Sequence, residues 1–352
     1  MGMMLRGKMV TEKMKIGMLF PLRKEHESLN KLCQDYPIEI VNTPYIETNE
    51  LRSARGLNNG KNSGLHTEPD IDDATKLEWQ NCDVIVSMDL PSDPRSLFPN
   101  LEWFQGVSAG YDHIDSSILA EMGVVQTSAR GIASASIAEF VFARLLQVYK
   151  DLRIIDQQQR EKTWKVKFGS QAYGKTIAIV GLGSIGREVA IRARAFGMTV
   201  LASKKNPNIG SPDVDVDELF SVGEIDTMIG MSDVVVMAAP ANDETRDMFN
   251  RDRFSLMKPG SVFCNIARGM HVVEDDLVEA LNSNHLGAAI LDVTRNEPLP
   301  SDSPIWSAKN MYLSPHCSVS FDRYEENAVA LLVENSQLFI EGKILINVVS
   351  GD

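Results

Sequence analysis

Three polar side chains in the second half of the chain stand just beyond predicted strands, where they can act together. They are Arg268, Glu297 and His316. Ligands of parallel α/β sheets bind outside the carboxyl ends of the strands, so the three side chains are expected to converge on one crevice. An arginine fork grips a carboxylate at two points, and a histidine gives or takes a proton near neutral pH. A carboxylate beside that histidine favours its protonated form and fixes its tautomer.

Each of these residues also has an ordinary explanation when it is taken alone. Arg268 is then a phosphate contact at a helix start, Glu297 a turn residue, and His316 a loop histidine with satisfied hydrogen bonds. The combination favours acid–base chemistry on an anionic substrate. Three further histidines lack such partners and are expected to be structural or solvated: His113, His271 and His285.

A glycine-rich turn opens the part of the chain that should position this chemistry. The residues Gly181-Leu182-Gly183-Ser184-Ile185-Gly186 follow the apolar run Ile177–Val180 and precede the amphipathic run Arg187–Phe196. A G-x-G-x-x-G turn between a strand and a helix is typical of dinucleotide binding, because its glycines permit the tight turn, the approach of a pyrophosphate and close helix–strand packing. The first N–H groups of the helix then face the phosphates. The alternative is a structural glycine turn in an unrelated α/β protein.

The second strand of this unit ends in a cationic segment instead of a carboxylate. Ser203, Lys204 and Lys205 stand where the dinucleotide fingerprint usually has an acidic residue that holds the ribose 2′-hydroxyl. A pair of cations suits a 2′-phosphate better. NADP(H) is therefore the expected cofactor in preference to NAD(H). The alternative is a solvated loop with two incidental lysines.

Bulk composition excludes several classes of protein. The 352 residues suffice for two domains, and contents of 43% hydrophobic and 24% charged residues are typical of a globular chain. The net charge of -13 argues against a nucleic-acid partner. No apolar run approaches the ~20 residues that span a bilayer, and no cluster has the spacing of metal ligands. Four scattered cysteines favour reduced thiols and a cytoplasmic setting.

Two series of apolar runs, separated by helical stretches, indicate two doubly wound parallel sheets covered on both faces. The strands expected in the first series are Ile16–Phe20, Ile38–Val41, Val84–Ser87, Trp103–Val107 and Val124–Thr127. Those expected in the second series are Ile177–Val180, Val200–Ala202, Val234–Ala238, Val262–Ile266, Ala288–Leu291 and Met311–Leu313. The predicted fold class is α/β, with a Rossmann dinucleotide-binding domain over residues 128–316 inserted in a flavodoxin-like substrate domain over residues 1–127 and 317–352.

Four other segments have a predicted character. Ser134–Arg153 has helical apolar spacing and is expected to be a long helix that connects the domains, and Glu325–Ile340 is expected to be a closing helix on the first domain. Ser53–Thr67, rich in Asn, Gly and Ser, is expected to be a mobile loop, and Met1–Lys15 a loose extension.

Four motifs together carry a family resemblance. They are GLGSIG at 181–186, NIARGMHVVEDDLVEAL at 265–281, AILDVTRNEPLP at 289–300 and LSPH at 313–316. In this combination the chain resembles the D-isomer-specific 2-hydroxyacid dehydrogenase family, on its glyoxylate/hydroxypyruvate reductase-like branch. The resemblance runs from about Lys15 to Asn347. It implies a homodimeric oxidoreductase that transfers a hydride between a nicotinamide and C2 of a small 2-keto or 2-hydroxy acid of the D-isomer.

The resemblance also implies a role for each site residue. Arg268 binds the substrate carboxylate and keto oxygen, His316 is the acid/base, and Glu297 pairs with His316. The substrate carboxylate is also held by backbone N–H groups of a loop with the residues Ser108, Ala109 and Gly110. The expected cofactor contacts are Gly181, Gly183, Ser184, Ile185, Gly186, Ser203, Lys204, Lys205, Ala239, Pro240 on the adenine side, Ala267, and Asp292 near the nicotinamide.

The chain departs from the family pattern at two places. Cys317–Phe321 replaces the small residues that usually follow the histidine, and Thr294 stands where an aromatic is frequent. The alternative function is a non-catalytic, nucleotide-sensing binding protein of the same fold, like the family's corepressor branch. The intact set of Arg268, Glu297 and His316 favours the enzyme.

Overall fold

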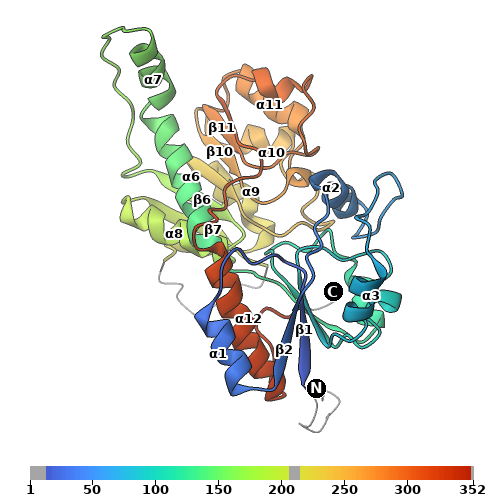
Figure 1. Ribbon diagram of the computed structural model, residues 1–352. Helices are drawn as coiled ribbons and strands as arrows, with labels where there is room; N and C mark the ends of the chain where they lie inside the picture. Colours follow the sequence, from blue (N-terminus) through green and yellow to red (C-terminus); the bar gives the residue numbers. More distant parts are fainter. Residues whose placement is uncertain (1–12, 206–214, 350–352) are drawn as a thin grey trace. The chain divides into compact units, whose positions relative to one another are not determined.

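The computed structural model describes residues 13–205 and 215–349, and the chain divides into two compact units (Figure 1). One unit comprises the chain up to Ile132 and from Phe321 onward, and the other comprises Ala133–Ser320. The second unit is therefore an insertion in the first. The expected extension before residue 13 lies outside the described residues, but Met14 and Lys15 already belong to the first strand.

The chain passes between the units a few residues beyond the predicted domain ends at 127 and 316. Local hydrogen bonds give the reason. The N–H of Ala129 donates to the Ser108 carbonyl at 2.9 Å, which keeps this stretch in the first unit. The N–H of Ser320 donates to Oγ of Ser136 at 3.2 Å, which keeps the residues after His316 in the second unit.

A five-stranded parallel sheet with the order β2-β1-β3-β4-β5 forms the first unit. Its strands are β1 (Met14–Met18), β2 (Ile38–Asn42), β3 (Val84–Ser87), β4 (Trp103–Gly106) and β5 (Val125–Thr127). Short runs rich in Val and Ile form these strands, since branched side chains pack well on a pleated surface that is covered on both faces. The order is that of flavodoxin-like sheets.

Apolar clusters cover both faces of this sheet. One joins it to α1 (Glu27–Asp35) and to the closing helix α12 (Tyr324–Ile340), which pack against each other (Figure 1). The other cluster includes Trp79 of α3 (Asp73–Trp79) and Leu119 of α5 (Ser116–Glu121). The remaining helices of the unit are α2 (Asn49–Leu57) and α4 (Pro94–Leu97).

Helix α2 takes in the start of the segment that was expected to be a loop. Residues 53–57 are helical, so the expectation is wrong for them. The helix begins where Oγ1 of Thr48 accepts the N–H of Leu51 at 3.2 Å. One turn later, Nε of Arg55 donates to the buried carboxylate of Glu47 at 2.8 Å. This buried ion pair, which composition does not reveal, anchors the helix.

A seven-stranded parallel sheet with the order β12-β11-β10-β9-β6-β7-β8 forms the second unit. Its strands are β6 (Thr176–Val180), β7 (Thr199–Ser203), β8 (Glu218–Phe220), β9 (Val234–Met237), β10 (Val262–Asn265), β11 (Ala288–Leu291) and β12 (Met311–Leu313). The strand order reverses between β6 and β9, as in Rossmann sheets. The two parallel sheets confirm the predicted fold class. Strand β8 was not predicted, because it is a short edge strand in which only Phe220 is buried.

The helices of the second unit correct one expectation. The helix predicted over Ser134–Arg153 is two helices, α6 (Ser134–Tyr149) and α7 (Leu152–Arg160), because Asp151 between them has a left-handed backbone with φ 53°. Helix α6 packs on α8 (Ser184–Ala195), whereas α7 buries none of its residues (Figure 1). The other elements are α9 (Ile225–Gly230), α10 (Arg251–Leu256), α11 (Glu274–Asn282), η1 (Val222–Glu224), η2 (Gly269–His271) and η3 (Pro304–Ser307).

Two arginines cover the free edge of β12. Arg144 of α6 donates to the Leu313 carbonyl at 3.0 Å, and Arg153 of α7 donates to the Met311 carbonyl at 2.7 Å. An edge strand with satisfied carbonyls is a poor template for pairing with other chains. Within the described residues, no helix has the length and apolar character required to cross a membrane.

Candidate active site

The glycine turn lies at the carboxyl end of β6, in the first turn of the Rossmann sheet. Gly181 has φ 103°, and a Cβ there would come within 2.6 Å of the Ala239 backbone. A Cβ on Gly186 would lie 2.3 Å from the Gly181 carbonyl oxygen, so helix α8 sits directly on the turn. At Gly183 a Cβ would meet nothing within 4 Å. The turn is therefore closed on the protein side and open in front of the α8 N-terminus, which begins at Ser184, and this arrangement fits a dinucleotide pyrophosphate.

The structure brings the other predicted cofactor segments of the sheet to this turn. Ala239 and Pro240 follow β9, and Ala239 packs against Gly181. The N–H of Leu182 donates to the Ser203 carbonyl at 2.9 Å, which joins the turn to the end of β7. The segments that follow β6, β7 and β9 thus meet at the glycine turn.

A carboxylate from another loop, which the sequence did not predict, contacts the predicted 2′-phosphate segment. Ser203 is buried at the end of β7, and the N–H of Lys204 donates to the Phe220 carbonyl at 3.1 Å. Lys205 forms an ion pair with Glu244, with 3.1 Å between Nζ and Oε2 and both side chains about two-thirds exposed. The charge of Lys205 is thereby partly compensated. An exposed pair of this kind is weak and can be displaced by a stronger anion.

Arg268 follows β10 on a loop that is fixed through its backbone. Nδ2 of the buried Asn265 donates to the Arg268 carbonyl at 2.8 Å, and Oδ1 of Asn265 accepts the N–H of Ala267 at 3.1 Å. Next in the chain, a Cβ on Gly269 would come within 2.0 Å of the Thr294 backbone. Only glycine permits this contact, so the Arg268 loop lies directly against the loop that carries Glu297.

Glu297 and His316 form the pair that was predicted. Nδ1 of His316 lies 2.8 Å from Oε2 of Glu297, while Oε1 of Glu297 accepts the N–H of Thr294 at 3.0 Å. The side chain of His316 is 48% exposed and that of Glu297 is 28% exposed, so the pair stands at the surface of the unit. Within residues 13–205 and 215–349, Nε2 of His316 makes no hydrogen bond. That nitrogen is available to a substrate.

Asp292 holds the loop that carries the histidine. Its buried carboxylate accepts hydrogen bonds from the hydroxyl of Ser314 at 2.7 Å and from the N–H groups of Cys317 at 3.0 Å and Ser318 at 3.1 Å. Its carbonyl accepts the N–H of His316 at 2.8 Å. His316 itself has a left-handed backbone with φ 52°, which costs conformational energy in a non-glycine residue. The departure at Cys317 therefore leaves a backbone N–H in place for Asp292.

The predicted substrate loop belongs to the first unit and lies at the carboxyl end of β4. Oγ of Ser108 donates to the Gly110 carbonyl at 2.5 Å, and Ala109 is exposed. The hydroxyl of Tyr324, at the start of α12, donates to the Val107 carbonyl. The loop is held from within its own unit.

In the described part of the chain, no three His, Cys, Asp or Glu side chains group in a way that could hold a metal ion. A ring nitrogen lies close to a backbone carbonyl in each of the three histidines that were expected to be structural or solvated. The pairs are His113 with Met88, His271 with Pro240 and His285 with Phe254.

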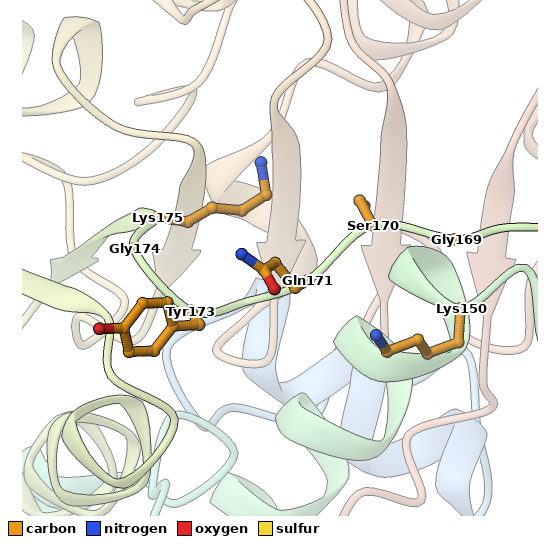
Figure 2. Close-up of a pocket in the computed structure, with 7 residues that line it drawn as sticks. All are labelled: Lys150, Gly169, Ser170, Gln171, Tyr173, Gly174 and Lys175. Carbon is orange, nitrogen blue, oxygen red and sulfur yellow. The ribbon is translucent and has the colours of Figure 1, made fainter.

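A hollow of about 530 Å³ lies elsewhere in the second unit (Figure 2). It is lined by Lys150 and by the stretch that leads into β6, with Gln171, Tyr173 and Lys175 as its larger side chains. Lys175 directly precedes β6, so the hollow lies at the amino end of that strand, whereas Arg268 and His316 follow the carboxyl ends of theirs. It contains none of the predicted site residues.

Comparison with known proteins places the chain. Residues 142–318 match the family described as "D-isomer specific 2-hydroxyacid dehydrogenase, NAD binding domain". A hydroxypyruvate reductase of Blautia hydrogenotrophica is 30% identical over 275 residues, which are 74% of this chain and 83% of that protein. A glyoxylate reductase of Thermococcus onnurineus is 32% identical over 255 residues, 70% of this chain and 75% of that protein.

A solved structure agrees with these sequences over nearly the whole chain. A D-isomer specific 2-hydroxyacid dehydrogenase family protein from Aeromonas salmonicida has a TM-score of 0.74 and 26% identity, covering 97% of this chain and 100% of its own. This chain is thus an enzyme with a nicotinamide cofactor and a small 2-hydroxy or 2-keto acid substrate. It belongs to the D-isomer specific 2-hydroxyacid dehydrogenase family, on the glyoxylate/hydroxypyruvate reductase-like branch.

Proposed function

We propose that the chain reduces a small 2-keto acid of the glyoxylate or hydroxypyruvate type to the D-2-hydroxy acid with NADPH. The observation that carries this proposal is the pair of Glu297 and His316, 2.8 Å apart and joined through Thr294 to the loop of Arg268. In this proposal, His316 is the acid/base group and Arg268 is the carboxylate-binding group, and both follow carboxyl ends of strands in the same sheet. The names of the relatives, glyoxylate reductase and hydroxypyruvate reductase, support the choice of substrate.

The mechanism assigns one task to each of the three side chains. Arg268 binds the substrate carboxylate and polarises the keto group, which holds C2 in place for the transfer. When bound, the nicotinamide supplies the hydride in reduction and accepts it in oxidation. His316, protonated, gives its Nε2 proton to the oxygen that becomes negative during reduction. Glu297 accepts the Nδ1 proton in a hydrogen bond and stabilises the imidazolium.

NADPH is proposed over NADH because cations end the second strand. Lys204 and Lys205 follow β7, next to the glycine turn, and no carboxylate follows that strand directly. The ion pair of Lys205 with Glu244 should limit the preference for NADPH over NADH, since the pair must open or shift before Lys205 can bind a 2′-phosphate. Lys204 is therefore expected to contribute most of the discrimination.

We also propose that the enzyme is a homodimer that uses an apolar arm, defined as α7 and residues 161–173. Trp164 is 99% exposed and Phe168 is 89% exposed, and Ile154 and Ile155 of α7 are partly exposed as well. A monomer rarely exposes apolar side chains so close together in the sequence. The Trp164→Glu/Phe168→Glu variant should lower the mass in solution to that of a monomer. Leu65→Glu, a change at an exposed leucine of the first unit, is the control and should not.

Absorbance at the NADPH band tests the proposed reaction. The purified chain is mixed with NADPH or NADH and, in turn, glyoxylate, hydroxypyruvate and pyruvate. Turnover that is fastest with NADPH and one of the first two acids is the expected result. Binding of NADPH without turnover of any acid would contradict the proposal and favour the nucleotide-sensing alternative.

A further inference from the structure

His271 is a fully buried imidazole in the loop of Arg268. It ends the short helix η2 and is 0% exposed. Its Nδ1 accepts the backbone N–H of Arg268 at 3.3 Å, and its Nε2 lies 3.3 Å from the Pro240 carbonyl oxygen. Because a backbone N–H can only donate, Nδ1 carries no proton. The ring is therefore the neutral tautomer with its proton on Nε2, which donates to Pro240.

The ring forms hydrogen bonds with two loops, one predicted to contact the cofactor and the other predicted to bind the substrate. Pro240 follows β9 on the cofactor side, and Arg268 follows β10 on the substrate side. The main chain joins the same segments a few residues further on, where the N–H of Phe249 donates to the His271 carbonyl at 2.8 Å. The imidazole thus lies between the two loops at the edge of the sheet where chemistry is expected.

The position is one where hydrogen bonding matters more than volume. His271 stands three residues after Arg268 and accepts its N–H, the task that Gln or Glu performs at this place in a capping box. An apolar side chain would fill the same space but would leave the partly buried N–H of Arg268 and the Pro240 carbonyl without this partner. An unsatisfied buried donor is expensive, so the loop would shift to find another acceptor.

We propose that His271 is a positioning residue, which sets the place of Arg268 relative to the cofactor-side loop through its two ring nitrogens. The inference rests on the proposed role of Arg268 in binding the keto acid. Loss of the ring's hydrogen bonds should therefore reduce the affinity for the keto acid more than it reduces the stability of the protein.

Two variants of nearly equal side-chain length separate hydrogen bonding from packing. His271→Gln keeps an acceptor for Arg268 and a donor for Pro240, whereas His271→Met offers neither in comparable strength. We expect His271→Met to raise the KM for the keto acid about three- to tenfold, the effect of one lost hydrogen bond. The Kd for NADPH without substrate should change less. His271→Gln should restore the keto-acid KM to within about twofold of wild type.

His285→Met is the matched control. The ring of His285 also meets a backbone carbonyl, that of Phe254 at 3.0 Å, but it lies away from Arg268. This variant should lower the melting temperature and leave the keto-acid KM unchanged. If His271→Met behaves like the control, with reduced stability and ordinary KM, the positioning role is overturned. Equal damage in the Gln and Met variants would overturn it too.

Amide hydrogen exchange of the wild-type enzyme provides a second test that needs no variant. The Arg268 amide should exchange slowly, because it is bound to a buried nitrogen. Rapid exchange would overturn the inference even if His271→Met fails to fold. If the wild type reduces no keto acid, the proposed function fails, but the exchange measurement still reports on the hydrogen bond itself.

Discussion

The imidazole of His316 and the carboxylate of Glu297 face each other across the ends of two adjacent strands. Glu297 follows β11 and His316 follows β12, which pair in parallel, and 2.8 Å separates Nδ1 from Oε2. The carboxylate is held by the N–H of Thr294, and the histidine loop by Asp292. Each partner is thus fixed by its own loop, so the pair exists before a substrate arrives. Because the pair is preorganised, the proton donor needs no reorganisation at the moment of reaction.

Removal of the acid should abolish most turnover. His316→Ala is expected to lower kcat by about 10²-fold or more, since general acid catalysis typically contributes 10²–10⁴-fold. Glu297→Gln keeps the shape and replaces the carboxylate that faces Nδ1 of His316 with a neutral amide, so kcat should fall in this variant as well. Steady-state rates of reduction test both variants. Near-normal kcat in His316→Ala would remove this residue from the mechanism.

Replacement of the arginine should affect the keto acid and spare the cofactor. Arg268→Lys keeps the charge and loses the two-point fork, so KM for the keto acid should rise and kcat should fall. The Kd for NADPH, measured by fluorescence without substrate, should change little. Arg144→Lys is the control, because Arg144 covers the β12 edge through the Leu313 carbonyl. Loss of cofactor affinity alone would identify Arg268 as a phosphate contact.

Asp292→Asn separates two roles for a residue that was expected near the nicotinamide. Its carboxylate accepts the N–H groups of Cys317 and Ser318, so an amide NH₂ group in place of one oxygen would face a donor. The histidine loop should shift, and kcat should fall about tenfold or more while the Kd for NADPH stays within about threefold. A weakened Kd with normal kcat would show instead that Asp292 acts through the cofactor.

The sequence predicted the strands well because each central strand is a continuous apolar run. Elements that depend on a single backbone angle or on long-range polar partners were not predictable in this way. The break between α6 and α7 rests on the left-handed backbone of Asp151, in a stretch with good helical spacing. Edge strand β8 buries one residue, and α2 is anchored by the buried pair of Arg55 and Glu47.

Within the site, sequence motifs placed the reacting side chains but not the groups that hold them. The convergence of Glu297 and His316 followed from their places just beyond strand ends, and their pairing was implied by the family resemblance. The hydrogen bonds of Asn265, Thr294 and His271 could not be predicted from the spacing of residues in the sequence, because each depends on which backbone groups the folded loops bring together. One signal was present: Asn265 and His271 both stand inside the motif that contains Arg268.

An acid-sensitive contact in the first unit should appear in stability measurements. Burial would raise the pKa of the Glu325 carboxyl, but hydrogen bonds from His26 and from the N–H groups of Arg23 and Lys24 lower that pKa below 4.5. A lowered folded pKa adds stability that is complete above the unfolded value and is lost as pH falls through the folded value.

Glu325→Gln should therefore destabilise the chain by about 1–3 kcal/mol at pH 7, the cost of a lost charged hydrogen bond. The difference in the free energy of unfolding between this variant and wild type should become smaller below pH 4.5. Urea unfolding at several pH values measures it. Glu326→Gln, which removes an exposed pair with Lys24, is the control and should have little effect. A difference that grows toward acid pH would contradict the assignment.

The charges near the end of β7 have opposing effects on the choice between NADPH and NADH. Lys204 and Lys205 favour a 2′-phosphate, whereas Glu244 partly compensates Lys205. Wild type should still prefer NADPH over NADH by about tenfold in kcat/KM, which needs only ~1.4 kcal/mol. Lys204→Asp should abolish or reverse the preference, because a carboxylate repels phosphate and accepts hydrogen bonds from a free ribose.

Lys175→Asp, at a lysine that lines the hollow of Figure 2, is the charge-matched control and should leave the ratio of kcat/KM values for the two cofactors unchanged. The preference should also weaken with added salt, since the lysines are accessible to solvent. If wild type uses NADH as well as NADPH, the lysines do not read the ribose, and the roles of Arg268, Glu297 and His316 are unaffected.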